Sequence, residues 1–242
     1  MKKRLKWAIP TVLIAAILSA FFIYTGTYYH ANAEAERYLI SDGGVRVEQA
    51  EYGWFFDGPS ETDALVFYPG AKVEETAYAP LCHRLAREGT DVFLVKMPFR
   101  LAFFGANKVD KIDAFGKYER RYIGGHSLGG VFAASYAEKN SDKIDGLILL
   151  ASYCTAKLDD GLKTVLIYGS EDTVLNAEKY RENLKNVPAD AAEYVIEGGN
   201  HAQFGSYGMQ KGDQPALITS EEQIEEAVAA IGGTVFESDR SP

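Results

Sequence analysis

Cysteine is nearly absent from this 242-residue sequence, which contains only Cys82 and Cys154. The two residues lie far apart in the chain, and neither belongs to a CxxC pair or to a Cys/His spacing typical of metal ligands. The sequence therefore predicts neither a metal site nor a redox pair. Two unrelated thiols in the core are the simpler interpretation, and a disulfide between them stays open.

Basic residues are also scarce once the first six positions are passed. The chain opens with Lys2, Lys3, Arg4 and Lys6, and its first acidic residue is Glu34. Beyond residue 6, 21 basic residues are outnumbered by 34 acidic ones, a formal charge of −13. Such a chain is poorly suited to binding nucleic acid through phosphates, and its acidic surface favours solubility.

Charge is missing altogether from residues 7–29, which are rich in Leu, Ile, Ala and Phe. A helix of that length can cross a hydrocarbon core of roughly 30 Å, and the basic residues before it predict that the rest of the chain lies outside the cytoplasm. The alternative is a signal peptide cleaved near Ala33, because ANA at 31–33 fits a signal-peptidase site. We expect 1–33 to be a membrane anchor or signal segment and 34–242 to be the exported domain.

Beyond residue 44, apolar segments alternate with helical patterns. Strands are predicted at 45–56 with a turn or bulge at Gly53, and at 64–70, 91–97, 120–125, 144–152, 164–169 and 192–198. Helices are predicted at 74–89, 109–119, 127–140, 176–186 and 220–233, the last with Ser220 in an N-terminal capping arrangement. This alternation predicts an α/β fold with a mostly parallel sheet and helices on both faces.

Ser127 lies in the pentapeptide GHSLG, between the strand at 120–125 and the helix at 127–140. A serine on a sharp strand-to-helix turn needs small neighbours two positions before and after it, and Gly125 and Gly129 provide them. The helix N-terminus behind the serine favours negative charge that develops there. The pattern predicts a nucleophile elbow, whereas a serine in an ordinary turn is the plainer interpretation.

A serine nucleophile needs a histidine base, and the chain has four histidines. His30 lies beside the apolar N-terminal stretch, His83 lies in the helix at 74–89, and His126 adjoins the serine with its side chain expected to point elsewhere. In the serine, acid, histidine order that follows such elbows, only His201 comes after Ser127. We therefore predict that His201 is the base.

The acid must lie between residues 127 and 201, at the carboxyl end of a strand. Asp172 follows the strand at 164–169 by a short turn and is predicted to orient His201 through Nδ1. Glu171 is the adjacent alternative, and Asp159 and Asp160 in a connecting segment are weaker ones. A turn or helix-capping aspartate is the plain interpretation of Asp172.

Hydrogen-bond donors for an oxyanion are expected from two places. One is the backbone N–H of Leu128, directly after the serine. The other is the loop after the strand residues 64–68, where Ala71 is the preferred donor and Gly70 the alternative. Further candidates are Lys72 and Lys96 for an anionic group of the substrate, and Phe99, Phe103, Phe104 and Tyr153 for an acyl pocket.

In these motifs the chain resembles the α/β-hydrolase superfamily, and looks most similar to its small, lidless dienelactone-hydrolase-like or esterase-like members. The resemblance runs from about residue 64 to residue 231 and rests on FYPGAKVEETAY, GGHSLGG, LIYGSEDTVL and GGNHAQFG. It implies serine acyl transfer through an acyl-enzyme that water hydrolyses, with no metal or organic cofactor. The chain has Pro-Gly where many esterases have His-Gly, and the connection after the strand at 144–152 is too short for a lid domain.

These features favour a serine-dependent carboxylic-ester hydrolase that is exported and membrane-anchored through its N-terminal helix. An open site favours small or surface-presented esters as substrates. The same triad can run amidase, peptidase or thioesterase chemistry, and a non-catalytic binding protein that kept the fold is the alternative from another class.

Overall fold

The computed structural model describes residues 2–236, with side chains from residue 10 onward. Its centre is an eight-stranded sheet in the order β1-β2-β4-β3-β5-β6-β7-β8. The strands are β1 (Arg46–Ala50), β2 (Gly53–Asp57), β3 (Asp63–Tyr68), β4 (Asp91–Val95), β5 (Arg120–His126), β6 (Gly146–Leu150), β7 (Lys163–Gly169) and β8 (Ala192–Ile196).

The six strands from β3 to β8 pair in parallel, whereas β1 and β2 form an antiparallel edge. Every residue of β3, β4 and β6 is buried, as expected for strands covered on both faces. At the β1–β2 turn, Gly53 has a φ of 145°, and a Cβ there would lie 2.1 Å from the Leu94 carbonyl oxygen. The turn predicted at Gly53 thus brings the edge hairpin tightly onto β4.

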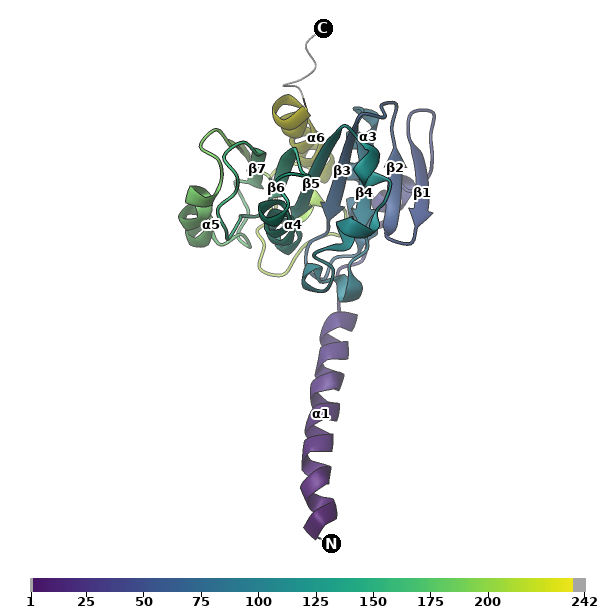
Figure 1. The fold of residues 1–242 in the computed structure, drawn as a ribbon, viewed down its shortest axis with the longest axis vertical. Helices are drawn as coiled ribbons and strands as arrows, with labels where there is room; N and C mark the ends of the chain where they lie inside the picture. Colours follow the sequence, from purple (N-terminus) through teal and green to yellow (C-terminus); the bar gives the residue numbers. More distant parts are fainter. Residues whose placement is uncertain (1, 237–242) are drawn as a thin grey trace.

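Helices cover both faces of the sheet, as Figure 1 shows. The core on one face contains residues of α3 (Ala79–Arg87) and α6 (Ser220–Ile231). The core on the other face contains residues of α4 (Leu128–Lys139) and α5 (Ala177–Asn183). The short connection between β6 and β7 leaves no room for a large lid. The mostly parallel sheet with helices on both faces that the sequence predicted is confirmed.

The N-terminal helix α1 (Lys2–Gly26) stands away from the body as a separate rod (Figure 1), and α2 (Ala33–Arg37) follows it on the body. Of the helices whose side chains the structure describes, none is long and apolar enough to cross a membrane. The predicted spanning segment is therefore not supported, and its first residues, 7–9, lie outside the described side chains.

Two local predictions were wrong, and the first turn of a third element differs from the prediction. The segment predicted as a helix at 109–119 forms only short 3-10 turns, at Lys108–Lys111 and Phe115–Lys117. The helix predicted at 74–89 begins as a 3-10 turn, Glu75–Tyr78, before α3. The cap of α6 is Thr219, not Ser220, because Thr219 and Glu222 form a reciprocal capping box.

Candidate active site

Ser127 lies at the junction of β5 and α4, at the carboxyl edge of the sheet. Its φ of 51° and ψ of −125° place a non-glycine residue in a strained conformation that is typical of a nucleophile elbow. A Cβ at Gly129 would lie 2.2 Å from the Tyr68 carbonyl oxygen, and one at Gly125 would lie 2.6 Å from the same atom. Both flanking glycines are therefore required by close backbone packing against the end of β3.

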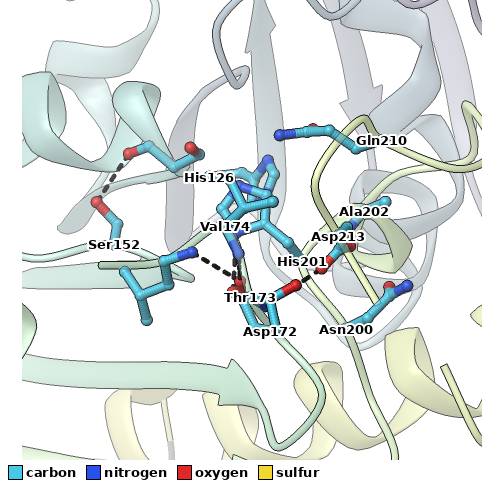
Figure 2. Close-up of polar contacts among 12 residues, drawn as sticks. His126, Ser152, Asp172, Thr173, Val174, Asn200, His201, Ala202, Gln210 and Asp213 are labelled. Atoms are coloured by element: carbon cyan, nitrogen blue, oxygen red, sulfur yellow. Dashed lines mark hydrogen bonds and ion pairs between the residues drawn. The ribbon is translucent and has the colours of Figure 1, made fainter. Parts of the chain in front are cut away.

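His201 and Asp172 are brought together from the segments after β8 and β7. Their Nδ1 and Oδ2 atoms lie 2.8 Å apart, and both side chains are 1% exposed. The other carboxylate oxygen of Asp172 accepts hydrogen bonds from the backbone N–H groups of Val174 and Leu175. Figure 2 shows this arrangement, in which the two backbone contacts hold one carboxylate oxygen while the other faces the imidazole.

The second ring nitrogen of His201, Nε2, is buried and has no hydrogen-bond partner within residues 10–236. Buried polar atoms are normally satisfied, so an orphan of this kind needs an explanation. The ring of His201 packs 4.5 Å, centroid to centroid, from the ring of His126, the residue before Ser127. The His201 ring thus lies beside the residue that directly precedes Ser127.

The other acidic candidates have different partners. Glu171 accepts a hydrogen bond from the Ser170 hydroxyl. Asp159 accepts from the Gly161 N–H, and Asp160 pairs with Lys157. Among the described residues, only Asp172 is in hydrogen-bond contact with the His201 side chain.

His126 was expected to point away from the site, but it is fully enclosed within it. Its Nδ1 lies 2.7 Å from the Tyr78 hydroxyl, which accepts a hydrogen bond from the Gly70 N–H at 3.0 Å. Burial, together with the neighbouring His201, holds the pKa of His126 well below its ordinary value, so the ring is neutral. The loop after β3 is in this way tied to the strand that carries the serine.

The hydrogen bond between Gly70 and Tyr78 also distinguishes between the candidate oxyanion donors. The Gly70 N–H is already used by Tyr78. The N–H of Leu128 belongs to the first turn of α4, where backbone donors have no partner within the helix. Ala71 is half-buried, and its N–H makes none of the backbone hydrogen bonds found in the described turns and loops. The geometry favours Leu128 and Ala71 over Gly70.

Two features missed by the sequence analysis hold the histidine loop in place. Asp213 accepts a hydrogen bond from the Ala202 N–H at 2.9 Å and a weaker one from the Thr173 N–H, so it bridges the loops of His201 and Asp172. Asn200 exchanges two hydrogen bonds with the Gln223 side chain of α6. Neither residue lies in a motif that sequence reasoning could have used.

The predicted cationic and aromatic substrate contacts have other partners. Lys96 is 3.3 Å from the Glu75 carboxylate, and the Lys72 ammonium lies 4.2 Å from the centre of the Tyr24 ring in α1. Phe99, Phe103 and Phe104 are exposed at the base of α1, not gathered in a pocket. Tyr153 packs against the core on the α4 face.

The loops beside the elbow carry further backbone strain. Lys72, Phe99 and Arg100 have φ values of 58°, 55° and 57°, and the left-handed conformation costs a non-glycine residue roughly 1–2 kcal/mol. The Lys72 N–H donates to the Arg100 carbonyl at 2.8 Å. The two strained loops thus support each other next to the site.

The remaining histidines lie away from this cluster. His30 pairs with Glu74 at 3.3 Å, and His83 lies 3.5 Å from Asp42 in a groove of about 810 Å³ between α2, α3 and α6. Among the described residues, no group of three or more His, Cys, Asp or Glu side chains is placed to hold a metal ion.

Comparison with known proteins agrees with this architecture. The model of the alpha/beta hydrolase family matches residues 64–225, more than half of the chain. No curated protein matches the sequence.

Solved structures with the same fold include a predicted CIB-like hydrolase from Thermoplasma acidophilum, at 16% identity and a TM-score of 0.57, over 77% of this chain and 98% of that one. A monoacylglycerol lipase from Paleococcus ferrophilus matches at 15% identity and a TM-score of 0.56, over 76% of this chain and 99% of that one. A membrane phospholipase A described as a bacterial virulence factor matches at 14% identity and a TM-score of 0.56, over 96% of this chain and 99% of that one.

Proposed function

The chain belongs to the alpha/beta hydrolase family, and we propose that it is a serine hydrolase that cleaves carboxylic esters through a Ser127–His201–Asp172 triad. One observation carries the proposal: a buried histidine, oriented by a buried aspartate and with its other nitrogen unpartnered, packs against the residue that precedes a strained serine. A structural ion pair would not need that free nitrogen. A general base that takes the proton of a hydroxyl group needs a free ring nitrogen.

The mechanism follows from the position of each group. Nε2 of His201 takes the Ser127 hydroxyl proton while Oγ forms a bond to the ester carbonyl carbon. The Leu128 and Ala71 N–H groups stabilise the resulting oxyanion, helped by the N-terminus of α4. The carbon–oxygen bond to the alcohol then breaks, and His201 gives its proton to the departing alcohol.

Water completes the cycle by the same steps. His201 takes a proton from the water as its oxygen attacks the acyl carbon, and the bond to Ser127 Oγ breaks with return of the proton to the serine. The carboxylic acid leaves. Asp172 keeps its hydrogen bond to Nδ1 of His201 and stabilises the imidazolium that forms twice in each turnover.

Ester chemistry is chosen over amide chemistry on the names of structural relatives, a monoacylglycerol lipase and a membrane phospholipase A, both of which denote ester hydrolysis. We also propose that the domain lies outside the cytoplasm, because basic residues precede the apolar stretch and none follows it until Arg37. Protease treatment of intact cells tests this: an exported domain is degraded without lysis, and a protected one refutes export.

The triad is tested by labelling the full-length protein with a fluorophosphonate and locating the adduct by peptide mass mapping. We expect one adduct, on Ser127, which is lost in Ser127→Ala and in His201→Ala. Ser152→Ala is a matched control, because the Ser152 hydroxyl only donates to the Ser127 carbonyl. Folded protein that gives no adduct would support the non-catalytic alternative.

A further inference from the structure

The described part of α1 exposes apolar side chains over its length. Seven large apolar side chains between residues 12 and 23 are more than half exposed: Val12, Leu13, Ile14, Ile17, Leu18, Phe22 and Ile23. Soluble proteins rarely leave so much contiguous apolar surface in water, and such surface marks a binding site. In Figure 1 the helix has no neighbour along most of its length.

A second apolar cluster continues this surface onto the body. Phe99, Phe103 and Phe104, in the loop after β4, are 44%, 68% and 45% exposed. Phe21 of α1 packs against two of them, with ring centroids 5.1 Å from Phe99 and 6.0 Å from Phe104. We call α1 residues 12–23 together with these three phenylalanines the apolar surface.

The apolar surface meets the body at the candidate active site. Directly after α1, Tyr29 pairs with the loop that follows β3: its N–H donates to the Lys72 carbonyl, and its carbonyl accepts from the Glu74 N–H. The Tyr29 hydroxyl accepts from the Lys211 N–H, ten residues after His201. The chain thus leaves the body between the loop of the oxyanion donor Ala71 and the loop of the catalytic histidine.

Charge at this junction indicates what the surface binds. The Arg100 guanidinium carbon lies 3.3 Å from the centre of the Tyr28 ring, and the Lys72 ammonium lies over Tyr24. Tyrosines and cations at the end of an apolar segment are typical of a contact with lipid headgroups, and anionic headgroups attract the cations.

We propose that the apolar surface binds a lipid bilayer and holds the mouth of the active site against it. The preferred substrate is then an ester of a lipid in that bilayer, which reaches Ser127 without passing through water. The proposed binding to a bilayer rests only on the apolar surface and does not depend on the proposed hydrolysis. The substrate claim rests also on the proposed ester hydrolysis, and it replaces the small esters that the absence of a lid suggested.

Binding is tested by flotation of the full-length protein with phosphatidylcholine vesicles that contain about one third phosphatidylglycerol. We expect the protein to float, and Phe103→Ser and Ile17→Ser each to lower the bound fraction at least about fivefold. Ile40→Ser is the matched control: Ile40 is 70% exposed but lies by Arg87 in the groove beside α3, away from the apolar surface. Protein that stays at the bottom, or equal losses in all three variants, would overturn the proposal. So would a stable dimer that Ile17→Ser dissociates in the absence of vesicles.

The substrate claim is tested with two esters and one variant. Ile17 lies on α1, remote from the triad, so Ile17→Ser should hydrolyse a short, water-soluble nitrophenyl ester at the wild-type rate. The same variant should hydrolyse a phospholipid embedded in vesicles at least about fivefold more slowly. Equal rates on the vesicle substrate would overturn the substrate claim. Wild-type protein that floats but cleaves neither ester would instead refute the proposed hydrolysis and leave lipid binding intact.

Discussion

At the scale of single residues, Asp172 and its neighbour Glu171 form a natural pair for testing the acid. Asp172→Asn keeps the shape of the side chain but removes the charge that stabilises the His201 imidazolium. We expect kcat to fall by about 10²–10⁴, while Glu171→Gln stays within about twofold because Glu171 contacts Ser170. Steady-state kinetics on a nitrophenyl ester measures both kcat values. A larger loss of kcat in Glu171→Gln than in Asp172→Asn would assign the acid of the triad to Glu171.

Tyr78 is predicted to be a positioning residue, because its hydroxyl joins Gly70 to His126. Tyr78→Phe leaves two buried polar groups unpaired, which costs about 1–3 kcal/mol of unfolding free energy. It also frees the loop that carries Ala71, so we expect kcat to fall about tenfold with little change in KM. If Tyr78 had a purely structural role, Tyr78→Phe would lower stability without a selective fall in kcat.

The control for Tyr78→Phe is Tyr207→Phe. Tyr207 is a neighbouring buried tyrosine whose hydroxyl donates to the Gln210 side chain, not to the loop after β3. We expect it to leave kcat within about twofold. An unchanged kcat in Tyr78→Phe, or an equal loss in both variants, would contradict the positioning role.

His126 predicts a dependence of stability on pH. Its pKa in the folded protein is well below the value of 6.5 expected in the unfolded chain. Between the two values only the unfolded chain binds the extra proton. The contribution of His126 to stability is therefore complete above about pH 6.5 and falls by up to about 1.4 kcal/mol per pH unit below it.

Denaturant unfolding of wild type and His126→Gln at pH 7.5 and pH 5.5 measures this contribution. The glutamine amide oxygen can accept a hydrogen bond from the Tyr78 hydroxyl but does not titrate, so the variant should lose less stability over that interval. His83, whose pKa is also lowered by burial, is present in both proteins and cancels. Equal losses in the two proteins would show that His126 titrates in the folded state as it does in the unfolded chain.

At the scale of elements, the junction of β5 and α4 depends on glycine. A Cβ at Gly129 would lie within 2.4 Å of two backbone carbonyl oxygens, those of Tyr68 and Pro69, which cannot rotate away. We expect Gly129→Ala to displace the start of α4, to cost about 1–3 kcal/mol of unfolding free energy, and to lower kcat at least about tenfold.

Gly116→Ala is the matched control, because a Cβ at Gly116 would have no atom within 4 Å. Thermal unfolding and ester hydrolysis should both stay close to wild type in that variant. Wild-type activity in Gly129→Ala would mean that the strained elbow tolerates a shifted helix, and that its geometry is not tuned for the reaction.

The same scale explains how much of the molecule could be predicted from sequence. The buried strands β3, β4 and β6 carry continuous apolar runs, which the sequence displays directly. The segment 109–119 misled because apolar residues at helical spacing can also pack short 3-10 turns onto a core, as Val109 and Phe115 do. The order of the strands depends on pairing between distant segments, and no local pattern contains it.

In the site, motif order alone identified Asp172 and His201 as a pair. The contact of Tyr78 with His126 joins residues 48 positions apart and lies in no motif, so only the folded chain reveals it. The same holds for Asp213, which bridges two loops from a segment without recognisable pattern.

At the scale of the whole molecule, the sheet divides the interior into two separate cores. Cys82 of α3 lies in the core shared with α6, whereas Cys154 lies in the core shared with α4 and α5. Both cysteines are buried and free. A disulfide would have to pass through the sheet, so the pairing left open by the sequence does not occur in this fold.

Thiol titration tests that division. Burial raises the pKa of Cys154 to about 11 and that of Cys82 well above its ordinary value, so little reactive thiolate forms at pH 8. We expect an aromatic disulfide reagent to leave the native protein unmodified for many minutes and to modify both cysteines in denaturant, with a melting temperature that reductant does not change. A loss of reactive thiols in denaturant that reductant reverses would show a disulfide. Rapid modification of the native protein would show that one of the two cores opens readily, and would place the weakest packing on the face whose cysteine reacts.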